Sequence, residues 1–126
     1  MAESAQSLGV AYVTTLPIPH LVPPGLNARE HWAAKSRRVR KEKQIVSLLI
    51  AKYEAPPLPV VVTMTRCAPR LLDDDNAVGA LKNVRDAVAH WLGIDDRDPR
   101  VTWKVEQRKV SRKEQGTVIR VERRNA

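Results

Sequence analysis

The chain of 126 residues has one cysteine, Cys67, and no phenylalanine. A single thiol excludes an internal disulfide and a zinc site built on cysteines. Aromatic residues make up only 4% of the sequence, so aliphatic side chains must fill the core. No apolar run approaches the roughly 18 residues of a membrane span, and the N-terminus lacks a charged-then-apolar secretion signal. We therefore expect a single domain over residues 1–126, with residues 1–9 as a disordered tail, no membrane partner and a cytoplasmic location.

Negative charge is scarce outside one stretch. The chain has 22 lysines and arginines against 14 aspartates and glutamates, a formal net charge of +8. All seven aspartates fall between Asp73 and Asp98, whereas all seven glutamates fall outside this window. By formal charge the window carries about −4 and the rest of the chain about +12. A basic protein favours nucleic acid or another polyanion as partner. The acidic island is either a solvated loop with aspartate caps and turns, or a divalent-metal site held against that polyanion.

The hydrophobic pattern predicts an α/β (α+β) fold, a small mixed sheet with two main helices packed on it. The predicted strands are residues 10–18, 60–66, 100–108 and 117–123, and the predicted helices are residues 28–53 and 76–92. Asn27 is the expected N-cap of the first helix, and Gly93 suits the end of the second. The strand over residues 60–66 is apolar enough for a central position, with Cys67 as a small core or strand-end residue. The last two strands read as a hairpin with a basic tip over residues 109–116.

The second predicted helix has a clear apolar stripe. Its members, spaced by three and four residues, are Ala77, Leu81, Val84, Val88 and Trp91. Lys82 and Asp86 lie four apart on another face, so they are expected to pair.

The first half of the first predicted helix is strongly basic. A solvated helix face explains this pattern as well as a phosphate-contacting face does. In the second case the contacting residues are Lys35, Arg37, Arg38, Arg40 and Lys41. The neighbouring His31 and Trp32 are interpreted as packing or capping residues.

The acidic island contains two carboxylate groups with the chemistry of a magnesium site. Asp73 and Asp75 are two residues apart, so on an extended segment both point the same way, with Cα atoms roughly 6.5–7 Å apart. Asp95 and Asp96 form the second pair. Mg²⁺ takes oxygen ligands and keeps several waters, so a few aspartates suffice. Lys82 adds a cation that could stabilise charge on a reacting phosphate, and the set indicates phosphodiester hydrolysis. No Ser-His-Asp pattern, Walker loop or HExxH motif offers a competing chemistry.

These residues carry a family resemblance. Asp73-Asp74-Asp75-Asn76, the helical segment Leu81–Val88 with its Lys82, and Leu92-Gly93-Ile94-Asp95-Asp96 together resemble the RusA family of Holliday junction resolvases. Pro23-Pro24-Gly25-Leu26-Asn27 is similar to the proline-rich loop of that family. The similarity extends from about Val10 to Val121, and its specific part is the acidic motifs.

The resemblance implies a dimeric, Mg²⁺-dependent endonuclease that cuts branched DNA at four-way junctions, in recombination and repair. Mn²⁺ would substitute for Mg²⁺. The implied metal ligands are Asp73, Asp75 and Asp96, with Lys82 as the essential cation and Asp95 assisting. The usual family lysine falls three residues after the asparagine, where this chain has Gly79. Lys82 shares that helix face about 4.5 Å further along the axis. A phage or prophage origin is compatible with so short a resolvase-like chain.

The spacing also predicts a dimer. An unbroken helix over residues 76–92 separates its ends by about 25 Å, whereas Leu92 to Asp96 spans at most about 14 Å. Asp96 therefore cannot return to Asp75 of its own chain, and a two-fold pairing of antiparallel helices would create composite sites. On this geometry Asp86 orients Lys82 and binds no metal. Two other functions stay open at this point, a non-catalytic nucleic-acid-binding protein and a metal-dependent ribonuclease.

Overall fold

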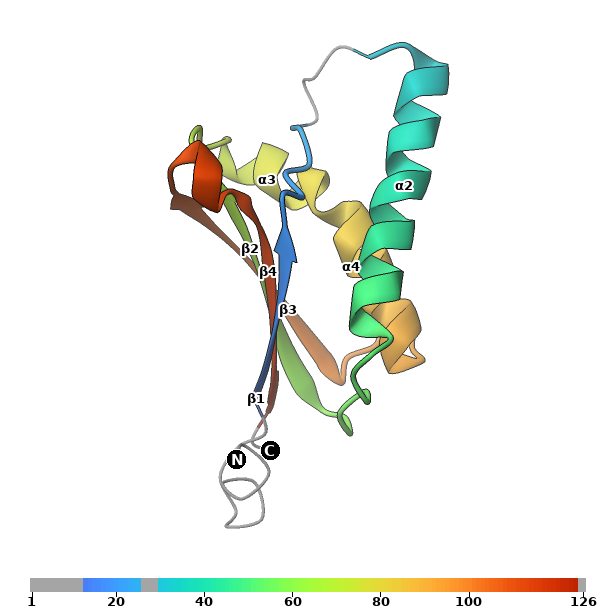
Figure 1. The fold of residues 1–126 in the computed structure, drawn as a ribbon. Helices are drawn as coiled ribbons and strands as arrows, with labels where there is room; N and C mark the ends of the chain where they lie inside the picture. Colours follow the sequence, from blue (N-terminus) through green and yellow to red (C-terminus); the bar gives the residue numbers. More distant parts are fainter. Residues whose placement is uncertain (1–12, 26–29, 125–126) are drawn as a thin grey trace.

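In the part of the chain that the structure describes, four strands form one mixed sheet, and three α-helices lie against one of its faces (Figure 1). The computed structural model describes residues 13–25 and 30–124. In chain order the elements are β1 (Val13–Pro19), α2 (Trp32–Ile50), β2 (Val60–Ala68), α3 (Asp74–Ala80), α4 (Lys82–Leu92), β3 (Val101–Lys109), the short 3₁₀ helix η1 (Arg112–Glu114) and β4 (Gly116–Arg123). The mixed α+β class is as predicted. No helix in the described ranges combines the length and apolar character needed to cross a bilayer.

The centre of the sheet is the apolar strand predicted for that position. β2 lies between β4, its antiparallel neighbour, and β3, its parallel neighbour. Val60, Val62 and Met64 point into the core beneath the helices and are fully buried. β2 continues past residue 66 to Ala68, and Cys67 is buried near its end, as expected.

The predicted hairpin of the last two strands is wrong. β3 and β4 lie on opposite sides of β2, and β4 inserts between β2 and β1. The connecting segment crosses the end of β2, where Val110 N donates to the Ala68 carbonyl at 3.1 Å, and contains η1. Alternation along two successive strands does not reveal which neighbour each one pairs with. Here the apolar β2 takes both of them as partners, because the centre of the sheet is its best-buried position.

The predicted helix over residues 76–92 is broken at Leu81, which separates α3 from α4. Leu81 departs from helical geometry, with φ −92° and ψ 7°, and is fully buried. α3 lies across one end of the sheet and α4 turns along it beside α2 (Figure 1). The apolar stripe is confirmed at its first four positions, which are buried, and Trp91 is half-buried. Gly93 ends α4 in the left-handed conformation at φ 73°, as expected for this residue.

The N-terminal boundaries differ from prediction. The first predicted residues of β1, the proposed cap Asn27 and the expected tail over residues 1–9 lie outside the described residues. α2 is shorter than the predicted helix, and His31 caps it by accepting a hydrogen bond from Ala33 N at Nδ1, 3.2 Å. Capping by His31 is thus confirmed. The prediction that Trp32 is a packing residue is wrong, because its side chain is 75% exposed.

Candidate metal and nucleic-acid site

Three exposed aspartates surround the start of α3. Asp73 is the N-cap, and Asp74 and Asp75 occupy the first helical turn. The expectation of an extended segment with Asp73 and Asp75 on one side is therefore wrong. The physical reason is the helix dipole, since carboxylates are stabilised near a helix N-terminus by typically about 0.3–1 kcal/mol each.

The helical geometry sends neighbouring aspartates toward different surfaces. Asp74 lines a hollow of about 710 Å³ beside β3, together with Ala77 and Val78 one turn later. Asp75 lies one turn before Gly79, on the helix face that lines a separate cleft of about 350 Å³ against α2. α3 thus borders both surfaces, and Gly79 and Ala80 at its end line the second one. We call the two surfaces the β3-edge hollow and the α2 cleft.

A glutamine on β3 fixes the chain directly before the aspartates. Leu72 N donates to Gln107 Oε1 at 2.8 Å, and Gln107 Nε2 donates to the Leu72 carbonyl at 2.7 Å. The amide side chain therefore acts as a short strand partner for one residue of the loop. Because Leu72 directly precedes Asp73, this double hydrogen bond sets where α3 begins.

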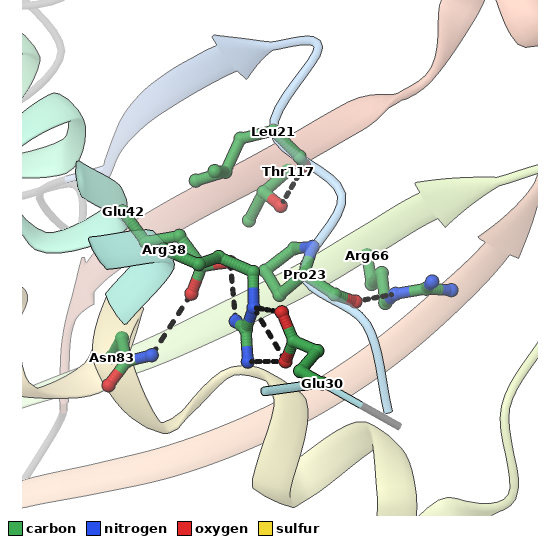
Figure 2. Close-up of polar contacts among 8 residues, drawn as sticks. All are labelled: Leu21, Pro23, Glu30, Arg38, Glu42, Arg66, Asn83 and Thr117. Atoms are coloured by element: carbon green, nitrogen blue, oxygen red, sulfur yellow. Dashed lines mark hydrogen bonds and ion pairs between the residues drawn. The ribbon is translucent and has the colours of Figure 1, made fainter. Parts of the chain in front are cut away.

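A buried arginine joins the two loops that meet at this point. Arg66 Nε donates to the Pro23 carbonyl at 2.9 Å (Figure 2), and its Nη1 donates to the Arg70 carbonyl at 3.1 Å. Burial lowers the pKa of Arg66 from its ordinary value. The proline-rich loop also touches the acidic segment, because a Cβ on Gly25 would lie 3.3 Å from Leu72 Cδ2. The two motifs of the family resemblance are therefore neighbours in space.

The second acidic pair lies beyond the end of α4. Arg85 Nη2 and Trp103 Nε1 both donate to the backbone carbonyl of Asp96 at 3.0 Å. The Arg85 guanidinium stacks over the Trp103 ring at 4.9 Å, and its buried Nε lies 3.6 Å from Asp96 Oδ2, too far for a hydrogen bond. Asp95 Oδ1 accepts from Arg97 N at 2.9 Å. This N–H, with the Asp96 carboxyl as the second cause, lowers the pKa of Asp95.

The two acidic groups do not converge within one chain. In residues 13–25 and 30–124, no three His, Cys, Asp or Glu side chains gather closely enough to share a metal ion. Gln107 holds the first group and Trp103 the second, so their attachment points are four residues apart along β3, about 13 Å of strand. The helix break at Leu81 does not bring Asp75 and Asp96 together.

Lys82 is exposed at the first position of α4 and lines the α2 cleft. Its expected pairing with Asp86 is not among the ion pairs of the described residues. Asp86 Oδ2 instead lies 3.5 Å from Lys43 Nζ on α2. Asp86 is thus the ion-pair partner of Lys43, not the predicted orienting partner of Lys82.

The basic half of α2 contains a structural ion-pair network that the sequence analysis missed. Arg38 donates to both carboxylate oxygens of Glu30 and, at 2.9 Å, to Glu42 (Figure 2). Glu42 is 5% exposed and also accepts from Asn83 Nδ2 of α4 at 3.0 Å. Glu30 raises the pKa of Arg38, and Arg38 lowers that of Glu30. This commitment weighs against the predicted phosphate contact of Arg38.

One sequence signal could have revealed this network. Glu30 and Glu42 are the two carboxylates within the predicted helix over residues 28–53, and Glu42 lies four residues after Arg38. The other predicted phosphate contacts, Lys35, Arg37, Arg40 and Lys41, are exposed on α2.

Comparison with protein families finds no family model that matches the chain. A protein of Xylella fastidiosa (strain Temecula1 / ATCC 700964), described as an uncharacterized protein, is 36% identical over 82 residues. The aligned part is 56% of this chain and 52% of that protein, so the chain spans about half the length of this relative.

Proposed function

We propose that the chain is a Mg²⁺-dependent endonuclease of the RusA type that resolves four-way DNA junctions as a homodimer. One observation carries the proposal. Two aspartate groups stand at opposite ends of the edge strand β3, and α3, which begins at the first of them, borders a cleft lined by lysines through Gly79 and Ala80. Oxygen donors without histidine or cysteine suit Mg²⁺ or Mn²⁺.

The metal would be held by Asp73 and Asp75 of one copy and Asp96 of the other, with Asp95 assisting. When bound, Mg²⁺ supplies Lewis-acid polarisation of a phosphate and a more acidic water. The chain's own contribution is placement. Gln107 and Arg66 fix the loop before Asp73, whereas Arg85 and Trp103 fix the backbone at Asp96. Lys82, facing the cleft, would stabilise charge that develops on the phosphate.

The β3-edge hollow supports a second copy as the group that completes the site. Leu71 and Val78, which line it, are 50% and 51% exposed, and they accompany the partly buried Val105. β3 is an edge strand, so its outer backbone groups are free to meet a partner. A two-fold axis through this hollow would reverse the second β3 edge. Asp96 of each copy would then lie at the end that carries Asp75 of the other.

Cleavage of a synthetic four-way junction, with and without Mg²⁺, tests the proposal. We expect metal-dependent paired nicks that Asp75→Asn reduces by more than about 100-fold, the upper range for losing a mere supporting group. Asp98→Asn is the matched control. Asp98 belongs to the same acidic island but is bonded to Arg100, and an asparagine oxygen can still accept from Arg100 N. Equal activity of Asp75→Asn and wild type would refute the site.

A non-catalytic nucleic-acid-binding protein is the second candidate, favoured by the separation of the two acidic groups in one chain. It predicts junction binding without nicks at any Mg²⁺ concentration. The same assay with structured RNA in place of DNA tests the ribonuclease alternative, which would cut the RNA and leave the junction intact.

A further inference from the structure

We infer that the α2 cleft is the seat of a backbone phosphate of the nucleic acid, bound by Lys35 and Lys82 with Lys43 beside them. This inference rests on the proposed nucleic-acid substrate, and it does not need the metal chemistry. The cleft is about 350 Å³ in volume and lies between α2 and the bend that joins α3 to α4. The basic residues that face outward from α2 are not part of it.

The lysines that line the cleft differ from its arginine in the ion pairs that they form. The charged residues that line it are Glu30, Lys35, Arg38, Lys43, Lys82 and Asp86. Arg38 is neutralised by Glu30 and by the buried Glu42, and Asp86 is paired with Lys43. Within the described part of the chain, Lys35 and Lys82 form no ion pair. Counted with Glu42, these groups sum to +1, and the two lysines without an ion pair stand on opposite walls, which favours an anion between them.

The walls of the cleft are fixed before any ligand arrives. Asn83 of α4 donates to Glu42 of α2, and Glu42 accepts from Arg38, so the two helices are joined at the base of the cleft (Figure 2). Gly25 and Gly79 are also among the residues that line the cleft. Lysine suits such a site because its ammonium acts as a compact point charge with rotatable donors.

The position of the cleft relates it to the aspartates. Gly79 lies one helical turn after Asp75 on the same face of α3. A strand whose phosphate sits between Lys35 and Lys82 would thus pass the start of α3. Arg37 and Arg40, by contrast, are exposed on α2 and line no part of the cleft. Lys35 is thus distinguished from Arg37 and Arg40, although the sequence places all three in one basic segment of the helix.

The test compares two double variants that remove the same charge. Binding of a labelled four-way junction is measured by fluorescence anisotropy in EDTA over a range of salt concentrations. Each neutralised phosphate contributes about 0.9 to the slope of log K against log salt. We expect the slope of Lys35→Gln/Lys82→Gln to be shallower by about 1 to 2 than that of wild type, with at least about tenfold weaker binding. Arg37→Gln/Arg40→Gln should stay within about twofold of wild type.

Several outcomes decide the matter. Equal losses in both double variants, or a larger loss in Arg37→Gln/Arg40→Gln, would overturn the inference, as would wild type that binds no nucleic acid. Lys35→Arg/Lys82→Arg retains the charge and should bind, and thermal melts show whether each variant folds. If the cleft double variant does not fold, Lys35→Gln alone should show about half of the slope change. Wild type that binds through the cleft without cutting would retain the inference and refute the endonuclease.

Discussion

At the residue scale, the aspartates have separate physical roles. Asp73, Asp74 and Asp75 are exposed at a helix N-terminus, where acidic side chains are favourable without a bound cation. Asp98 is bonded to the Arg100 guanidinium and backbone, whereas Asp86 is paired across the α2 cleft. An acidic run in a sequence therefore does not define one site, and each carboxylate must be assigned from its own contacts.

Asp98 predicts part of the acid sensitivity of the fold. The Arg100 side chain and, second, its N–H lower the pKa of Asp98 from 3.8 to about 2. Because the folded-state pKa is depressed, the stabilisation is complete above pH 4 and disappears as the pH falls through about 2. Asp98→Asn should flatten the fall in unfolding free energy between pH 4 and 2, measured by urea titration. An unchanged pH profile would contradict this assignment.

At the element scale, the bend at Leu81 and the Gln107 hydrogen bonds determine where the acidic groups lie. The bend lets α3 cross the end of the sheet while α4 packs beside α2, with a fully buried leucine as the pivot. Gln107 then ties the loop before α3 to β3 through two backbone hydrogen bonds. A neutral side chain far from the acidic motif in sequence thus places its first residue.

Gln107→Met should lower both the free energy of unfolding and the affinity of the protein for Mn²⁺. Loss of both hydrogen bonds leaves half-buried backbone groups of Leu72 without partners, which costs about 1–3 kcal/mol of unfolding free energy. Gln44→Met on the exposed side of α2 is the control and should remain within about 0.5 kcal/mol of wild type. Urea denaturation and Mn²⁺ titration measure the two effects. Equal stability of the two variants would show that the Gln107 contacts contribute nothing.

The positions of the helices and strands could be predicted from the sequence better than the pairing of the strands. An apolar, β-branched run located β2, and the three- and four-residue spacing located the buried stripe of α3 and α4, because buried positions are filled by apolar residues. Strand order leaves no such mark, so the pairing of β4 with β2 was missed. At the site, aspartate clustering was visible, whereas Gln107, Glu42 and Arg66 act through partners distant in sequence. Apart from the four-residue spacing of Glu42 and Arg38, their hydrogen-bonding roles follow from the fold alone.

At the scale of the whole molecule, the uncovered β3 edge is the feature that links fold to function. Its hollow carries exposed aliphatic side chains, and an aspartate group stands near each end. About 13 Å of strand is too long for one ion with ligand distances near 2.1 Å to reach both groups. In the proposed dimer, a second copy related by two-fold symmetry would remove this obstacle without a change in the chain's own conformation.

Mixing two inactive variants tests whether the sites are shared between copies. Asp75→Asn and Asp96→Asn are each expected to abolish junction nicking as homodimers. If Asp75 of one copy works with Asp96 of the other, a mixed dimer contains one doubly altered site and one intact site. Subunit exchange should then restore nicks in one strand. Sites contained within single chains would leave the mixture inactive, although sedimentation still showed dimers.

The insertion of β4 between β1 and β2 has a consequence for biosynthesis. Among the described strands, β1 pairs with β4 alone, and β4 follows all the other described elements along the chain. While the ribosome is still translating residues 116–123, β1 cannot form its hydrogen bonds to β4, and the edge of β2 that pairs with β4 stays unpaired. The nascent polypeptide can assemble its helices and the parallel β2–β3 pair early, but the sheet closes only after this last strand emerges. A stalled or truncated product would therefore expose two strands with unpaired edges, β1 and β2, to chaperones and proteases.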